Sequence, residues 1–254
     1  MKRVLHESAF VLHQYPWSES SLILEVFTRH HGRVALVAKG VKRPSSQFRA
    51  VLLPLQPLQI GFAGDAEVQT LKAAEWQGGL TMPTGDALLS GYYLNELLMK
   101  LLARDDPHEQ LFDAYALAVQ WLRDAAQLDS SLRAFELLLL REIGLLPTLD
   151  AASLTTSALL PDSMYGLVAE LGLREMSNAQ LARGDAALPG SVWLALQAAL
   201  DQRASMLPVR ACVLALPAAQ KLALKQQLRS LLNYHCGSHG LRTRQLMRDV
   251  QALA

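Results

Sequence analysis

The sequence predicts an α+β protein in which a small antiparallel β-barrel precedes a bundle of α-helices. Residues 1–80 hold five short apolar segments with no helical pattern between them. Beyond residue 85 the apolar residues recur at helical spacing. A chain of 254 residues, about half of them apolar, is long enough to bury a core in one or two domains. We therefore expect one domain over 1–80 and a second over 81–254.

The predicted strands cover residues 8–14, 21–28, 33–41, 50–62 and 67–76, and turn-forming residues stand near most of their ends. The "RHHGR" and "GFAGDAE" segments are typical of hairpin connections, because glycine tolerates positive φ. The longer "KRPSSQFR" segment predicts a loop, since Pro44 and the serines disfavour strand pairing. Five such strands fit an OB-like barrel and an SH3-like barrel equally.

The predicted helices cover 86–104, 107–126 and 129–147, followed by 191–204, 217–237 and 242–253. Asp86 and Asp129 are expected to cap the first and third helices, and these three helices to form an antiparallel bundle. Their leucine and aromatic stripes predict core. Residues 148–190 show no sustained period and are expected to form a loop-like subdomain.

Composition and motifs argue against several classes of protein. No apolar run approaches the roughly 20 residues of a membrane-spanning helix, and the N-terminus lacks a signal-peptide pattern. Cys212 and Cys236 alone make no disulfide framework, which predicts a reducing cytoplasm as the location. Dinucleotide, P-loop, hydrolase-elbow and zinc-protease motifs are absent. Cys236 and His239 have the spacing of half a zinc site, but no second pair completes it. Asp105 and Asp106 alone do not make a nuclease centre. We expect no enzyme, no metal and no cofactor.

The net charge is only +1, but six cations stand together near the N-terminus without an acidic residue from Val26 to Gly64. A barrel face lined with such cations can follow a phosphate backbone, which needs positive donors and little geometric precision. The predicted DNA-binding residues are Arg29, Arg33, Lys39, Lys42, Arg43 and Arg49. The alternative is an ordinary solvated loop. Phe48, His30 and His31 are candidate base-stacking residues, although barrel core is the simpler role for Phe48.

Several segments, the predicted strands over 50–62 and 67–76 among them, carry a resemblance to a known family. Residues 16–46, "PWSESSLILEVFTRHHGRVALVAKGVKRPSS", closely resemble the N-terminal signature of the RecO family of bacterial recombination mediators. Residues 91–102 and 132–147 resemble its first bundle helix and its Arg–Phe–Glu–Leu helix. Residues 241–250 are similar to its closing segment. The resemblance covers most of the chain and is weakest over 148–200.

This resemblance implies an N-terminal OB-fold, a helical bundle domain, and a mediator without catalysis. Such a protein binds single- and double-stranded DNA and anneals complementary strands. It acts with RecR to help load RecA on DNA coated by single-strand-binding protein, so RecA is an indirect partner. The implied location is the cytoplasm, at the nucleoid.

Two further family features concern particular residues. Many members carry a four-cysteine zinc site after the glycine turn of the bundle, whereas residues 148–190 contain no cysteine, which implies a degenerate, zinc-free insertion. Some members bind the acidic tail of single-strand-binding protein on the helical domain. That contact would fall here on Arg133, Arg123, Leu122 and Phe112, although bundle core and an Arg133–Glu136 or Arg133–Asp129 pair are competing roles. The rival to the DNA-binding hypothesis is an adaptor that binds only proteins.

Overall fold

The computed structural model describes residues 3–79, 81–153, 157–202, 206–237 and 241–252. It forms two compact units, of which the first contains Met1–Arg123 and Thr243–Ala254 and the second Asp124–Arg242. The first unit is therefore discontinuous in sequence. These units divide the chain after Arg123, whereas a domain boundary near residue 80 stays a prediction.

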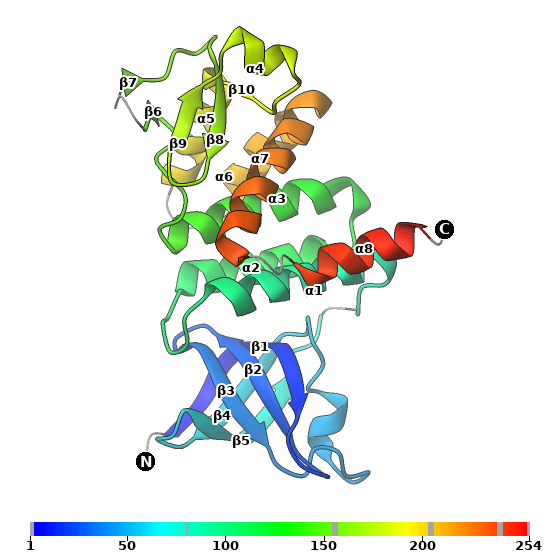
Figure 1. The fold of residues 1–254 in the computed structure, drawn as a ribbon. Helices are drawn as coiled ribbons and strands as arrows, with labels where there is room; N and C mark the ends of the chain where they lie inside the picture. Colours follow the sequence, from blue (N-terminus) through cyan, green and yellow to red (C-terminus); the bar gives the residue numbers. More distant parts are fainter. Residues whose placement is uncertain (1–2, 80, 154–156, 203–205, 238–240, 253–254) are drawn as a thin grey trace. The chain divides into compact units, whose positions relative to one another are not determined.

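The five N-terminal strands form a closed barrel in the order β1-β2-β3-β5-β4 (Figure 1). Their bounds are β1 (Arg3–Pro16), β2 (Leu22–Thr28), β3 (Gly32–Ala38), β4 (Leu58–Ala63) and β5 (Val68–Trp76). The long β1 strand pairs with both β2 and β4, and β3 and β5 pair in parallel. This topology confirms the predicted OB-fold and excludes the SH3-like alternative. The one parallel pair was not foreseen from the sequence.

Alternating side chains of the strands fill the barrel. Val11, Leu24, Leu36, Ile60 and Phe62 are fully or almost fully buried within one apolar cluster. The side chains between them point outward, as the two-residue period of a strand requires. The barrel core is therefore built from the short apolar segments of residues 1–80.

The fourth predicted strand, 50–62, is wrong over its first half. Residues Gln47–Ala50 form a 3-10 turn, η1, and β4 begins only at Leu58. Pro54 and Pro57 lack the N–H groups that a paired strand needs, and buried Leu55 adopts a positive φ of 62°. The 39–57 segment is consequently a long connection that crosses one end of the barrel.

Two helices complete the first unit beside the barrel, α1 (Gly85–Leu101) and α2 (Glu109–Trp121). Asn95 of α1 donates from Nδ2 to the Leu12 carbonyl at 3.0 Å, and the Tyr115 hydroxyl of α2 donates to Asn95 Oδ1 at 2.6 Å. Phe10, on β1, packs edge-on against the Tyr115 ring. The helices are thus fixed to the outer surface of β1 and β2.

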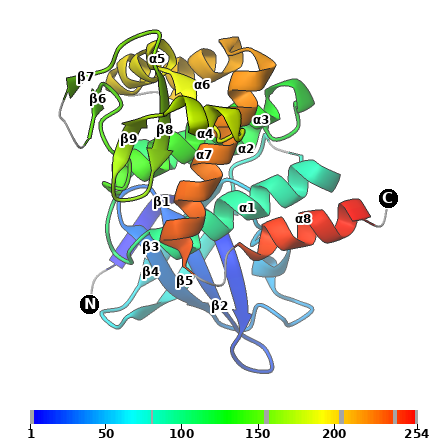
Figure 2. The same ribbon diagram turned by 45° about the horizontal axis from the view of Figure 1, so that its top comes forward.

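The C-terminal helix α8 (Arg242–Ala252) contacts α1 at its first turn (Figures 1 and 2). At its start Thr243 donates from its N–H to Glu96 Oε2 at 2.9 Å. Arg244 donates to the Tyr93 hydroxyl at 2.7 Å, and its guanidinium lies 5.0 Å from the centre of that ring. These contacts return the end of the chain to the first unit.

The second unit contains α3 (Ala125–Glu142), which packs against α6 (Met206–Ala215) and α7 (Ala218–Cys236). The predicted three-helix bundle is therefore divided, with α3 in one unit and α1 and α2 in the other. The N-cap predictions also differ: Asp124 caps α3 by accepting from the Ala126 N–H at 3.0 Å, and α1 begins after Thr84.

Residues 148–190 contain short strands rather than a bare loop. A three-stranded sheet is formed by β10 (Leu188–Pro189), β8 (Met164–Val168) and β9 (Gly172–Glu175), beside the hairpin of β6 (Ala151–Ala152) and β7 (Ser157–Ala158). The helices α4 (Asn178–Ala182) and α5 (Gly190–Asp201) follow β9 and β10. Buried Trp193 joins α5 to this sheet by donating to the Tyr165 carbonyl at 3.3 Å. An apolar core around Trp193 thus stabilises this region.

Candidate nucleic-acid interface

The barrel topology divides the six predicted DNA-binding cations into two groups. Arg29 and Arg33 flank the turn between β2 and β3. Lys39, Lys42, Arg43 and Arg49 follow β3, at the opposite end of the same strand. We call these last four residues the loop cations. The sequence placed all six within 21 residues, and the fold separates them into groups with different surroundings.

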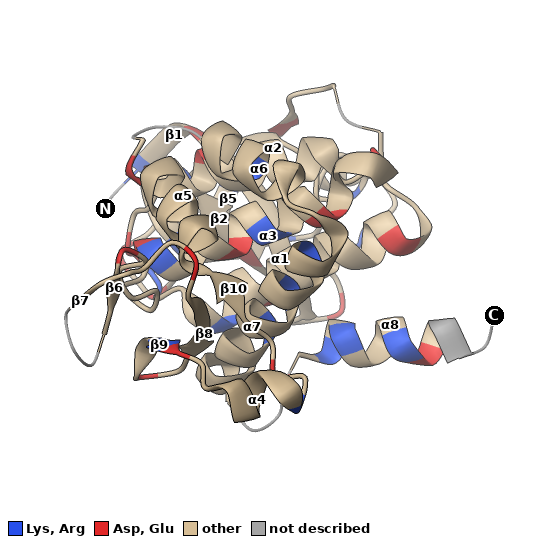
Figure 3. Cartoon of the chain, turned by 90° about the horizontal axis from the view of Figure 1, so that it is seen from above, with Lys and Arg blue, Asp and Glu red and all other residues tan. Residues whose placement is uncertain are grey.

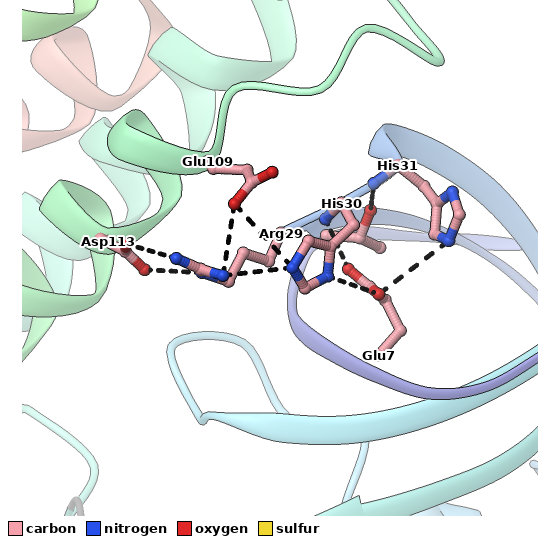
Figure 4. A network of polar contacts seen from close by, with 7 residues as sticks. Glu7, Arg29, His30, His31, Glu109 and Asp113 are labelled. Carbon is pink, nitrogen blue, oxygen red and sulfur yellow. Dashed lines mark hydrogen bonds and ion pairs between the residues drawn. The ribbon is translucent and has the colours of Figure 1, made fainter.

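Arg29 is engaged by acidic side chains of α2 (Figure 4). Its Nε donates to Asp113 Oδ1 and its Nη2 to Asp113 Oδ2, both at 3.0 Å, and its Nη1 lies 3.3 Å from Glu109 Oε2. The hydrogen bond to Asp113 raises the pKa of Arg29. Its charge is therefore balanced within the first unit.

Arg33 is largely buried and serves the same unit. Its Nη1 donates to Glu25 Oε2 at 2.8 Å, while its Nε and Nη2 both donate to the Leu102 carbonyl at 3.2 and 3.0 Å. Glu25 is 2% exposed and also forms an ion pair with Arg104. The hydrogen bond to Glu25 raises the pKa of Arg104. A buried carboxylate with two guanidinium partners is a structural cluster, because an unpaired charge in a buried site would strongly destabilise the fold.

The two candidate stacking histidines contact barrel residues (Figure 4). His30 donates from its backbone N–H to Glu7 Oε1 at 2.6 Å, and its Nδ1 lies 3.1 Å from Glu7 Oε2. The His31 ring packs edge-on against Phe62, at 5.6 Å between centroids. Phe48 packs against the barrel core, as its simpler role predicts.

Helix α2 covers part of the outer surface that OB-folds commonly use. Such barrels bind oligonucleotides through strands 2 and 3 and their neighbouring loops. Here Phe27 of β2 is fully buried and its ring lies 5.3 Å from that of Phe112 on α2. At the β2–β3 turn Gly32 approaches the Asp106 backbone so closely that an added Cβ would lie 2.1 Å from its carbonyl oxygen. The turn end of that surface is therefore occupied by the protein itself.

The loop cations, in contrast, are all exposed. The Lys42 N–H donates to the Ser20 carbonyl at 3.0 Å and its Nζ to the Ser18 carbonyl at 2.8 Å, which joins their segment to the β1–β2 loop. Gly40, with φ of 71°, turns the chain between Lys39 and Lys42. Lys42 and Arg49 line a groove of about 540 Å³ beside β1, together with His13, Gln14, Leu53 and Tyr92.

Two aromatic side chains near the loop cations were missed by sequence reasoning. Trp17, in the β1–β2 loop, is 66% exposed, and Tyr15, at the end of β1, is 42% exposed. Exposed aromatic rings beside cations are the combination that single-strand binders use, with rings for bases and cations for phosphates. Pro16 and the polar "SES" segment after Trp17 were the available signal, because they mark a turn that leaves its aromatic residue in solvent. Glu19, also exposed, places one acidic group in the same loop.

The residues predicted to bind the tail of single-strand-binding protein have mixed surroundings. Phe112 and Leu122 are 5% and 1% exposed within the first unit, as core residues are. Arg123 is exposed at the end of that unit. Arg133, in the second unit, is buried and its Nη1 lies 2.7 Å from Glu136 Oε2. The Arg133–Glu136 pair is thus present, and a role of these four residues in tail binding stays a prediction.

Helix α8 adds Arg242, Arg244 and Arg248, and blue marks the cations along it (Figure 3). Arg244 contacts Tyr93, whereas Arg248 is exposed.

Within the described ranges, no three His, Cys, Asp or Glu side chains gather where a metal ion would bind. His239, half of the sequence-level zinc pair, lies outside those ranges. No helix in the described part of the chain is both long and apolar enough to cross a membrane.

Comparison with known proteins gives a consistent result over the whole chain. The family model described as "Recombination protein O N terminal" matches residues 1–79, and "Recombination protein O C terminal" matches residues 82–245. The "DNA repair protein RecO" of Variovorax paradoxus is 62% identical over 99% of this chain and 98% of its own length. Those of Albidiferax ferrireducens and Polaromonas sp. are each 60% identical, covering 100% and 99% of this chain and 98% and 99% of their own lengths.

Proposed function

The chain belongs to the RecO family, whose members act in DNA repair and recombination, and on that premise we propose that it binds DNA through the loop cations. It takes both single- and double-stranded DNA, since phosphate contacts carry no sequence information and exist on both. By neutralising phosphates on two complementary strands it lowers their mutual repulsion and promotes annealing.

The observation that carries this proposal is the contrast between the two groups of cations. Arg29 and Arg33 are paired with carboxylates of their own unit. The four loop cations are exposed, and the chain contains no acidic residue from 26 to 64. Trp17 and Tyr15 supply aromatic surface next to them. The geometry therefore supports a grip on a flexible polyanion at one end of the barrel.

The remainder of the proposal concerns partners. The protein acts in the cytoplasm as a mediator that shifts binding equilibria and makes or breaks no covalent bond. It binds the tail of single-strand-binding protein, engages RecR, and thereby helps RecA to load. The support for these steps is the family, since the relatives are named for DNA repair and their names specify no partner.

Annealing of complementary oligonucleotides tests the proposal with a charge-matched control. The variant Lys39→Glu with Arg43→Glu reverses two exposed loop cations, and the control Arg174→Glu with Arg183→Glu reverses two exposed cations of the second unit. We expect the loop variant to lose most of its annealing and oligonucleotide binding, and the control to retain both.

Equal activity of the two variants would contradict the assignment of the grip to this loop. A wild-type protein that leaves the anisotropy of a labelled oligonucleotide unchanged at low salt would instead support the adaptor that binds only proteins.

A further inference from the structure

A second, apolar cavity opens beside the groove of the loop cations. It measures about 370 Å³ and is lined by Ala50, Val51, Leu53, Gln56, Trp76 and Met82. We call it the Trp76 slot. Its size falls within the range of small-molecule sites, roughly 300–1,000 Å³, and its lining is mostly apolar, as in such sites. All of its walls belong to the first unit.

One polar group in the slot has an incomplete set of hydrogen bonds. Gln56 is 5% exposed, and its Oε1 accepts from the Trp76 indole N–H at 3.0 Å. Because an indole nitrogen only donates, this contact fixes the orientation of the amide and turns Nε2 the other way. There Nε2 meets the Met82 sulfur at 3.9 Å, and a thioether is a weak acceptor. A buried amide donor is thus held ready for a stronger acceptor.

The wall shared with the groove determines what the slot can hold. Leu53, 44% exposed, lines both the Trp76 slot and the groove that contains Lys42 and Arg49. Trp76 is 53% exposed at the end of β5. An apolar slot with an aromatic wall and an amide donor therefore adjoins two cations. Ring, hydrogen-bond acceptors and phosphate occur together in one chemical group, the nucleotide.

We propose that the Trp76 slot receives one unstacked nucleobase of a single strand whose phosphates lie against Lys42 and Arg49. The base stacks on Trp76 and accepts a hydrogen bond from Gln56 Nε2 through a carbonyl or ring nitrogen. This inference rests on the proposed DNA binding and adds to it a device that distinguishes strand types. A duplex keeps its bases within the stack, so it contacts the cations and leaves the slot empty.

A nucleobase explains the slot better than an apolar side chain of a partner protein. A leucine or phenylalanine would fill the apolar volume and give Gln56 Nε2 no acceptor. Every nucleobase carries hydrogen-bond acceptors in the plane of its ring, on the edges that are not linked to the sugar. Stacking on an aromatic side chain contributes roughly 5- to 150-fold in affinity per base, so one occupied slot produces a measurable preference.

The test compares variants of the full chain by fluorescence anisotropy with three probes: an oligothymidine, a duplex of the same length, and an abasic oligonucleotide that keeps the phosphates. Trp76→Ala is expected to weaken oligothymidine binding about 10-fold and to lower the ratio of single-strand to duplex affinity by a similar factor. On the abasic probe it should bind as tightly as the wild type. Leu53→Ala should also weaken oligothymidine binding, and because Leu53 is partly exposed this variant should fold even if the tryptophan variant does not.

Tyr234→Ala removes an equally exposed aromatic ring, 53%, from the second unit and serves as the matched control. Unchanged oligothymidine affinity in both slot variants would overturn this inference and leave the proposed function intact, as would an equal loss on all three probes. Absence of binding to every probe by the wild type would overturn both. An acidic phenylalanine-containing peptide that binds the wild type and not Trp76→Ala, while oligothymidine affinity is unchanged, would reassign the slot to a protein partner.

Discussion

Replacing Arg33 by alanine separates the structural cations from the loop cations most directly. The change removes three hydrogen bonds, one to Glu25 and two to the Leu102 carbonyl, and leaves a carboxylate that is 2% exposed. Removing one partner of a buried ion pair costs about 3–5 kcal/mol. Because Arg104 still contacts Glu25, we expect the low end of that range, about 3 kcal/mol.

Urea unfolding measures this loss. Trp17, Trp76 and Trp121 belong to the first unit and only Trp193 to the second, so intrinsic fluorescence reports mainly the first unit. With a slope of about 2–3 kcal/mol per molar urea, the midpoint should fall by roughly 1–1.5 M. DNA affinity of the folded variant should change little, because Arg33 donates to protein oxygens only in the contacts described above.

The control is Arg174→Ala, which removes an exposed cation of β9 and should leave stability within about 0.5 kcal/mol. A midpoint for Arg33→Ala within about 0.2 M of the wild type would refute the reasoning, since it would mean that the buried cluster contributes little free energy. A strong loss of DNA binding without loss of stability would return Arg33 to the set of DNA contacts.

Three further outcomes follow from the same structure. The logarithm of single-strand affinity should fall with the logarithm of salt concentration at a slope of about −3, because four loop cations release roughly 0.7 counterion each; a slope near −4 would implicate all six cations. Gly32→Ala should lower the thermal midpoint strongly, because its Cβ would lie 2.1 Å from the Asp106 carbonyl oxygen. Gly78→Ala, at a similar φ with open space around it, should cost only about 1 kcal/mol of stability. Equal losses in the two variants would show that φ alone determines the cost. Burial raises the pKa of Tyr115, so the folded state keeps the phenol neutral while the unfolded chain ionises above pH 10. The free energy of unfolding of the wild type should therefore fall by up to about 1.4 kcal/mol per pH unit above that value. Tyr115→Phe should be less stable by roughly 1–3 kcal/mol at neutral pH and should lack this fall when urea unfolding is measured as a function of pH.

The strands and most helices were predictable because their signal is local. Short apolar segments bounded by turn-forming residues located β1, β2, β3 and β5, and helical spacing located α1, α2, α3, α5, α7 and α8. The errors arose where the backbone overrides composition. Residues 50–57 are as apolar as a strand, but Pro54 and Pro57 prevent pairing. Helix α6 was not predicted because it is short and contains Pro208, a residue that usually disfavours a helix. The helix accepts this proline because it stands in the first turn, where the backbone N–H has no partner within the helix.

The candidate interface was predictable only in part, since charge spacing along the chain does not reveal the partners of each charge. Arg29 and Lys39 are both cations of the same acid-free stretch of sequence. Only the structure shows that Arg29 donates to Asp113 of α2, which lies 84 positions away in the chain. The same limit applies to the Trp76 slot. Trp76 and Gln56 are 20 residues apart, and the antiparallel pairing of β4 with β5, in which Leu58 lies opposite Trp76, brings the indole N–H to the amide oxygen. Such long-range contacts depend on topology, which the periodicity of single elements does not encode.

The discontinuity of the first unit has a consequence for synthesis. The ribosome releases the barrel, α1 and α2 early, but Thr243 and Arg244, which complete the packing around Glu96 and Tyr93, emerge only after the entire second unit. A nascent or truncated chain ending near Arg123 would therefore lack the contacts that the start of α8 makes with Glu96 and Tyr93 of α1. Recombinant fragments of the barrel with α1 and α2 should be more stable when the C-terminal helix is supplied, either fused through a short linker or added as a peptide.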